Sequence, residues 1–90
     1  MLEQRITLIN KLGLHARATA KLINVTTQFS SKIMMGRSPD RLVDAKSIMS
    51  VMLLAASKGT ELYFQIEGND ETEAWQAIEE IILQRFGEEE

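Results

Sequence analysis

An imidazole and a guanidinium lie two residues apart in the segment Gly13-Leu14-His15-Ala16-Arg17, and their types and spacing suit chemistry on an anion. His15 is the only histidine of the chain and falls between a loop glycine and the start of a helical pattern. The unpaired N–H groups of a helix start favour a neutral, nucleophilic imidazole and can also bind an anion. The guanidinium of Arg17 can bind phosphate oxygens in bidentate fashion. The segment therefore predicts that His15 takes up a phosphoryl group and that Arg17 supports it.

The alternative to a chemical role is that His15 is an ordinary surface residue or an imperfect helix cap. No Asp or Glu is near it in sequence to orient the ring. There is also no second histidine and no cysteine to share a metal ion, so we expect no metal site and no cofactor. Local chemistry alone leaves both interpretations open.

Composition places the chain among small globular proteins. Its 90 residues, 44% hydrophobic and 26% charged, predict a single domain over residues 1–90 and a monomer. A net charge of −3 argues against a nucleic-acid partner, which requires concentrated positive charge. No apolar run approaches the roughly 20 residues of a membrane span, and the N-terminus lacks the features of a signal peptide. We therefore expect a cytoplasmic protein with no membrane partner.

Four segments alternate between apolar and polar residues, as strands of a half-exposed sheet do. In the clearest of them Leu62, Phe64 and Ile66 are expected to face inward, and Tyr63 outward. Pro39 fits the second position of the turn between the two middle strands. The strands are expected over residues 5–9, 31–36, 41–44 and 60–67.

Three helices are expected in the remaining segments. The first begins at Ala16, Ser47 is the N-cap of the second, and Asp70 with Glu73 forms a capping box at the third. Residues 87–90, Gly87-Glu88-Glu89-Glu90, are expected to be a frayed acidic tail. The order strand, helix, strand, strand, helix, strand, helix predicts an α+β fold. It is an open-faced two-layer sandwich with a four-stranded antiparallel sheet and three helices on one face.

Two motifs in different parts of the chain resemble one protein family. The segment Gly13-Leu14-His15-Ala16-Arg17-Ala18-Thr19-Ala20 closely resembles the active-site segment of the histidine phosphocarrier (HPr) family of bacterial phosphotransferase systems. Lys46-Ser47-Ile48-Met49-Ser50-Val51-Met52 resembles the second signature of the family, and the similarity spans nearly the whole chain. One departure is Ala18, where the family usually has proline. Because alanine is the best helix former, the first helical turn should persist.

The resemblance implies a fold and an activity. It implies the open-faced sandwich and phosphorylation of His15 on Nδ1 by enzyme I, with phosphoenolpyruvate as the ultimate donor. It also implies transfer of the phosphoryl group to a histidine of an enzyme IIA partner, with Arg17 as the phosphate-supporting arginine. Such a protein is a carrier with a transient phosphohistidine rather than an autonomous enzyme.

The second motif suggests regulation and docking. Ser47 matches a serine that a dedicated kinase phosphorylates in some bacteria, and this role is compatible with a helix cap. Ile48, Met49 and Met52 match an apolar patch that family members use to dock partners, for which flexible methionines are suited. Because Val51 is assigned to the core, at least one of these three should be exposed.

Two further questions stay open at the level of sequence. An HPr-like regulatory module that binds partners without carrying phosphate is the runner-up, but His15 and Arg17 favour the carrier. The segments 10–13 and 85–90 resemble carriers of the nitrogen-related branch, whereas 46–52 resembles sugar-branch carriers with the regulatory serine. We slightly favour the nitrogen-related branch. A small-molecule enzyme is disfavoured because no second acid or base lies near His15 in sequence.

Overall fold

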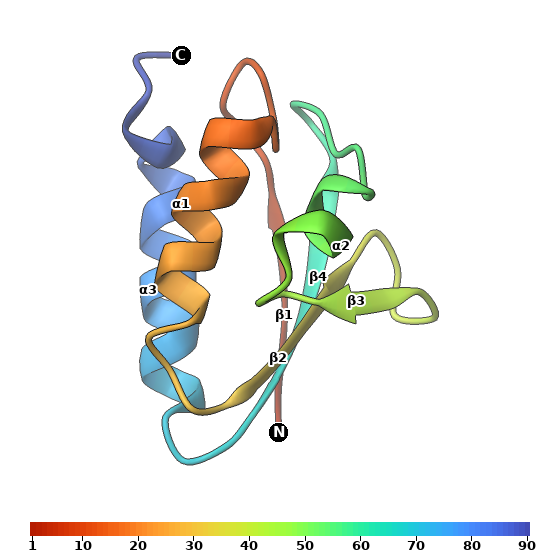
Figure 1. The fold of residues 1–90 in the computed structure, drawn as a ribbon, viewed down its shortest axis with the longest axis vertical. Coiled ribbons are helices and arrows are strands. Elements are labelled where there is room, and N and C mark those ends of the chain that lie inside the picture. The colour runs from red at the N-terminus through yellow and green to blue at the C-terminus, as the bar shows by residue number, and fades with distance from the viewer.

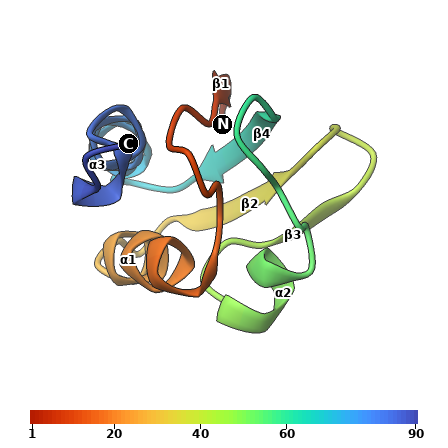
Figure 2. The same ribbon diagram turned by 90° about the horizontal axis from the view of Figure 1, so that it is seen from above.

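The computed structural model describes all 90 residues and shows two layers, a sheet and a set of helices on one of its faces (Figures 1 and 2). The predicted α+β open-faced sandwich is confirmed. The sheet consists of β1 (Leu2–Thr7), β2 (Lys32–Gly36), β3 (Leu42–Asp44) and β4 (Glu61–Glu67). The helices are α1 (Ala16–Thr26), α2 (Ile48–Met52) and α3 (Glu71–Leu83), and a short 3-10 turn, η1 (Arg85–Gly87), follows α3.

The sheet has the strand order β1-β4-β2-β3, and every neighbouring pair is antiparallel. Ile66 of β4 pairs with Leu2 on one side and with Ile33 on the other, so the last strand of the chain lies inside the sheet. β1 begins earlier and ends earlier than the predicted range 5–9. Its first residues are mostly polar, and only the backbone pairing with β4 reveals that they belong to the strand.

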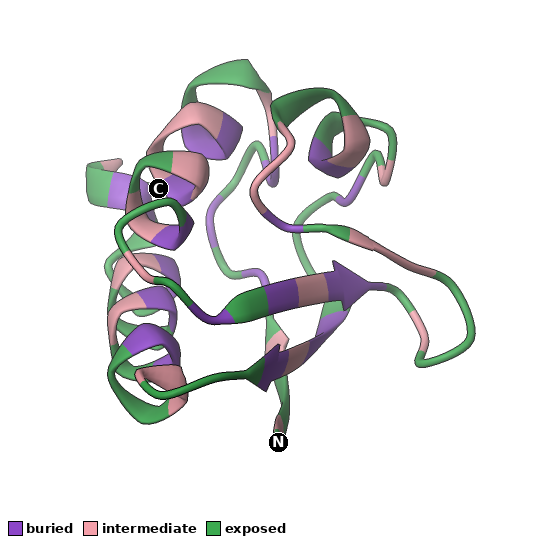
Figure 3. Cartoon of the chain, turned by 60° about the horizontal axis from the view of Figure 1, so that its bottom comes forward, coloured by how far each residue is buried: buried purple, intermediate pink, exposed green.

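The core lies between the sheet and the helices (Figure 3). The predicted inward residues of β4 are confirmed, since Leu62, Phe64 and Ile66 have no exposed surface. The ring of Phe64 meets that of Trp75 from α3 at a centroid distance of 5.5 Å, in a tilted arrangement that aromatic pairs favour. α1 contributes Leu22, which is likewise fully buried. This packing holds α1, and with it the segment before it, against the sheet.

Tyr63 differs from the expectation of an outward, exposed residue. It lies on the helix-free face of the sheet but is only 6% exposed. Its hydroxyl donates a hydrogen bond to the carboxylate of Glu3, and the guanidinium carbon of Arg5 lies 5.1 Å from its ring centre. Cross-strand partners from β1 therefore cover a ring that alternation alone assigns to solvent.

The predicted capping box at the start of α3 is wrong. Asp70 is the N-cap residue, but its side chain makes no cap hydrogen bond. Its carboxylate instead accepts bonds from Ser30 N (2.9 Å), Ser31 N (3.0 Å) and both serine hydroxyls, which connects the loop after α1 to the start of α3. These bonds, above all that from the Ser31 hydroxyl, lower the pKa of Asp70 from 3.8 to about 2.

Asp70→Asn should destabilise the protein at neutral pH and have a smaller effect in acid. A carboxyl whose pKa is lower in the folded protein adds stability above its unfolded pKa, and this stability disappears as the pH falls through the folded value. The gap in melting temperature between parent and variant should therefore be full above about pH 5 and close between about pH 4 and 2. Melting curves across this range measure it, with Asp40→Asn in the exposed β2–β3 turn as the control. A gap that persists unchanged to pH 2 contradicts the assignment.

Candidate functional site

Backbone contacts with the segment after α2 shape the loop that carries His15. Gly13 has φ of +63°, and a Cβ atom there would lie 2.4 Å from the carbonyl oxygen of Ala56. The N–H of Leu14 donates to that same oxygen at 2.9 Å, and the hydroxyl of Thr19 donates to Leu14 O at 3.1 Å. Only glycine fits both the conformation and the close approach. The loop is thereby held in the path that leads into α1.

α1 begins at Ala16, as the sequence predicts, which makes His15 its N-cap residue, but the His15 side chain does not cap the helix. The first helical bond runs from Thr19 N to His15 O at 2.8 Å, so the N–H groups of Ala16, Arg17 and Ala18 have no helical acceptor. The side chain of His15 is 28% exposed. An accessible imidazole therefore lies beside free backbone donors, an arrangement that suits an anion carried on the ring.

The expectation of a frayed acidic tail is wrong. The tail folds back, so that the chain end lies near the start of α1 (Figure 1). One carboxylate oxygen of Glu88 pairs with His15 Nε2, and the other accepts from Asn10 Nδ2 at 3.1 Å. Lys11 binds Glu90 twice, through its backbone N–H to a backbone oxygen at 2.5 Å and through Nζ to the side-chain carboxylate at 3.2 Å. The tail thus forms one wall of the site.

Glu88 is a residue of the site that sequence reasoning missed, because 73 positions separate it from His15. The acidic run was visible, but nothing in its spacing shows where it folds. In the structure the pKa of Glu88 lies below its usual value, chiefly because of the hydrogen bond from Asn10 and further because of that from His15. The side chain is therefore a carboxylate at neutral pH, and it faces the imidazole as a hydrogen-bond acceptor.

Arg17 is exposed and has no ion-pair partner. It lines an open pocket of about 400 Å³ together with Lys11, Leu12 and the three tail residues 88–90. The guanidinium is thus available to an incoming anion, on the first turn of the helix that His15 caps. The two residues that the sequence singles out share one end of the molecule.

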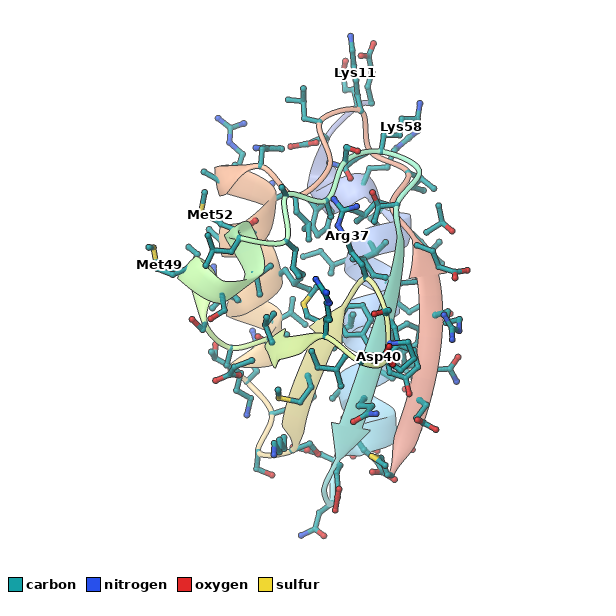
Figure 4. All side chains as sticks on the ribbon, turned by 90° about the vertical axis from the view of Figure 1, so that its right-hand side faces the viewer. Lys11, Arg37, Asp40, Met49, Met52 and Lys58 are labelled. Carbon is teal, nitrogen blue, oxygen red and sulfur yellow. The ribbon has the colours of Figure 1, made fainter.

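The second motif forms a short helix with an exposed apolar side. Ser47 caps α2 as predicted, its hydroxyl accepting from Ser50 N at 3.3 Å, and Val51 is fully buried. The predicted patch is exposed at all three positions, 41% at Ile48, 70% at Met49 and 42% at Met52. Figure 4 shows Met49 and Met52 projecting from α2 at one side of the view, with Lys11 and Lys58 toward the top and Arg37 below Lys58. Exposed apolar side chains gathered on one short helix form a surface suited to contact with another protein.

The rest of the molecule adds two plain findings. No group of three or more His, Cys, Asp or Glu side chains is arranged to hold a metal ion. None of the helices has the length and apolar character needed to cross a bilayer.

Fold and site together define a class of protein: a small open-faced sandwich that presents a single accessible histidine at a helix start, next to a free arginine. Comparison with known proteins identifies the family within this class. Residues 2–84 match the family model described as the PTS HPr component phosphorylation site. The phosphocarrier protein HPr of Pseudomonas aeruginosa is 53% identical over 85 residues, which cover 94% of each chain. That of Cupriavidus necator is 51% identical over 90 residues and covers both chains completely.

A solved structure agrees with the sequence relatives. The crystal structure of HPr from Thermoanaerobacter tengcongensis superposes with a TM-score of 0.93, at 41% identity and with both chains fully covered. The chain therefore belongs to the HPr family, the phosphocarrier proteins of the phosphotransferase system. The resemblance seen in the two motifs is confirmed.

Proposed function

We propose that this protein is a cytoplasmic carrier that accepts a phosphoryl group on His15 from phosphorylated enzyme I and passes it to a histidine of an enzyme IIA component. The single observation that carries the proposal is the placement of His15. It is the only histidine, its ring is accessible, and three free N–H groups of α1 follow it. Membership of the phosphocarrier family supports the same assignment.

The surroundings of His15 favour reversible rather than permanent phosphorylation. A hydrogen bond to a charged group is worth about 1.5–3 kcal/mol net, and an exposed helix end adds about 0.3–1 kcal/mol. Arg17 and the free N–H groups together supply contacts of this size to a phosphoryl dianion. Such contacts change a transfer equilibrium by roughly one to three powers of ten, which leaves the group free to move on to the next protein.

Incubation with purified enzyme I and phosphoenolpyruvate tests the function directly. The intact mass of the protein should rise by one phosphoryl group, and mild acid should remove it, because a phosphohistidine is acid-labile whereas a phosphoserine is not. An HPr-like regulatory module without carrier activity shows no gain. A gain that survives acid shows modification at a hydroxyl instead of His15.

Arg17→Lys should slow phosphoryl transfer about tenfold without abolishing it. The substitution keeps the positive charge but removes the planar fork that binds two phosphate oxygens, which is worth about one charge-assisted hydrogen bond. Rapid-quench kinetics with phosphorylated enzyme I measure the rate. The matched control is Arg41→Lys, an exposed arginine in the β2–β3 turn. If both variants transfer at the parent rate, Arg17 does not support the phosphate.

We propose that partners dock on Ile48, Met49 and Met52, and that a serine kinase can use Ser47 to control this docking. Support comes from the exposure of the three apolar side chains directly after Ser47. A phosphate carries about −1.5 to −2 charge, and at a helix start it is compatible with the fold. Next to an apolar docking surface it imposes a desolvation penalty, which should appear in partner affinity.

Ser47→Asp should therefore raise the Michaelis constant for enzyme I about tenfold while the melting temperature changes by no more than about 4 °C, equivalent to less than one kcal/mol. Ser47→Ala serves as the control, because it removes the cap bond to Ser50 without adding charge. The Ala variant should lose some stability and keep the parent Michaelis constant. Inhibition that follows a collapse in melting temperature argues against control of docking.

For the branch, we propose the nitrogen-related phosphotransferase chain. The two segments whose sequences favour it, 10–13 and 85–90, are in direct contact through Asn10–Glu88 and Lys11–Glu90, so they act as one unit at the site. The alternative is the sugar branch, which the sequence of 46–52 favours. Transfer from the phosphorylated protein to purified enzyme IIA of each branch, measured side by side, decides between them. Faster transfer to the sugar-branch component refutes the proposal.

A further inference from the structure

The carboxylate of Glu88 binds two groups at the site at once. One oxygen pairs with His15 Nε2 and the other accepts from Asn10 Nδ2. Asn10 is itself fully buried, and its Nδ2 also donates to Gly13 O at 2.8 Å. Glu88 is therefore held in place by the same loop that carries His15. An acceptor fixed on both oxygens defines the orientation of the ring that it binds.

The chain also adopts unusual backbone conformations to bring the tail to this place. Arg85 and Phe86 have φ of +55° and +54°, and Gly87 has +78°, so three consecutive residues are left-handed. For non-glycine residues this costs about 1–2 kcal/mol each. Burial of the Phe86 ring offsets part of the cost, and Lys21 Nζ binds Phe86 O at 2.6 Å. A reversal of this kind at a chain end points to a role for the residues that follow it.

We propose, resting on the function proposed above, that Glu88 is a positioning residue for phosphoryl transfer: it keeps the proton of the neutral His15 ring on Nε2, so that Nδ1 carries the lone pair that attacks phosphorus. An ionised carboxylate can only accept a hydrogen bond, so its imidazole partner atom must be N–H. A neutral imidazole has one N–H and one lone pair, and the lone pair is then on Nδ1.

The transfer step balances without moving this proton. The lone pair of Nδ1 forms the new N–P bond while the bond from phosphorus to the donor atom breaks, and that bonding pair stays with the donor. The ring then carries a positive charge that it shares between Nδ1 and protonated Nε2, next to the negative charge of Glu88. When the group leaves for an acceptor, the N–P bond breaks and its electron pair returns to Nδ1. Glu88 touches neither phosphorus nor the leaving atom and acts through His15.

The experiment combines NMR of the His15 ring with transfer kinetics in the full chain. The 15N resonances of the ring, recorded at a pH where the imidazole is neutral, report which nitrogen carries the proton. The parent should show the Nε2–H form alone, and Glu88→Ala should show exchange between both forms. Glu88→Ala should also lower the transfer rate about three- to tenfold at an unchanged Michaelis constant, as loss of one partly exposed charge-assisted hydrogen bond predicts. Glu88→Gln, whose amide oxygen can still accept from Nε2–H, should recover part of the rate.

Glu79→Ala is the matched control, since it removes the same charge at an exposed position of α3 that makes no side-chain hydrogen bond or ion pair. It should keep the parent 15N pattern and rate. A parent-like ring spectrum in Glu88→Ala, equal losses in both alanine variants, or a faster Glu88→Ala protein overturns the proposal. The ring spectrum requires no enzyme I. A parent protein that accepts no phosphate thus refutes the proposed function, whereas an unaltered tautomer refutes the role of Glu88.

Discussion

His15→Ala should abolish acid-labile phosphorylation by enzyme I and phosphoenolpyruvate. The variant removes the only imidazole of the chain, and no other side chain at the site can form a phosphoramidate with comparable ease. The loss should reach the detection limit of the assay, at least about 1000-fold, because it removes the nucleophile itself. Intact-mass measurement before and after acid treatment reads it out.

The fold should survive this substitution. The side chain of His15 is partly exposed, and its only polar contact is the pair with Glu88. The melting temperature should therefore change by no more than about 8 °C, equivalent to about 1 kcal/mol. Circular dichroism of the same samples separates loss of chemistry from loss of structure. Full acid-labile labelling of the alanine variant would mean that phosphate is carried elsewhere, and the proposed function would fail.

Gly13→Ala should produce the largest loss of stability among the single substitutions at the site. The new Cβ would lie 2.4 Å from Ala56 O and 2.7 Å from Ser57 Cα, both backbone atoms that cannot swing away. Overpacking costs about 1–3 kcal/mol and a positive φ at alanine about 1–2 kcal/mol. A total of about 2–5 kcal/mol corresponds to a fall in melting temperature of at least about 10 °C. Displacement of Leu14 should lower the transfer rate as well.

Gly59→Ala is the control for Gly13→Ala. Gly59 also has a positive φ, +90°, but nothing lies within 4 Å of the Cβ position there. It should lose only the conformational part, about 1–2 kcal/mol, and keep the parent transfer rate. Thermal melts of both variants measure the difference. Equal losses would show that the close approach between the His15 loop and the segment after α2 is unimportant.

The fold could be predicted because the pattern of apolar and polar residues within each strand and helix indicates the type of that element. β4 has a clear alternation, and its three inward residues are the fully buried ones. Prediction failed where a partner distant in sequence decides the outcome. Asp70 has the residue type and position of a helix cap, yet its carboxylate binds the N–H groups of Ser30 and Ser31 instead of those of α3. Tyr63 alternates outward and is then covered by residues of β1.

The site was predictable to the same extent. The placement of His15 at a helix start and the exposure of the α2 patch depend on local pattern, and both are confirmed. The contact between Glu88 and His15 could not be predicted, because an acidic run after a glycine is typical of a solvated chain end. Its path depends on left-handed residues at Arg85 and Phe86, for which neither residue type has a preference. Tertiary contacts with Asn10 and Lys21 stabilise that path.

The inside position of β4 has a consequence for how the protein is made. A ribosome releases the N-terminus first, yet β1 finds its only sheet partner in β4, residues 61–67, and β2 pairs with β4 along one of its two edges. Until that strand emerges, the β2–β3 pair is the only ladder that the nascent chain can form. α1 has no complete sheet to pack against during this time, and Glu88 arrives later still. The carrier site is therefore completed only after β4 and Glu88 have been made, so a prematurely terminated chain that lacks β4 contains His15 without the sheet that positions it.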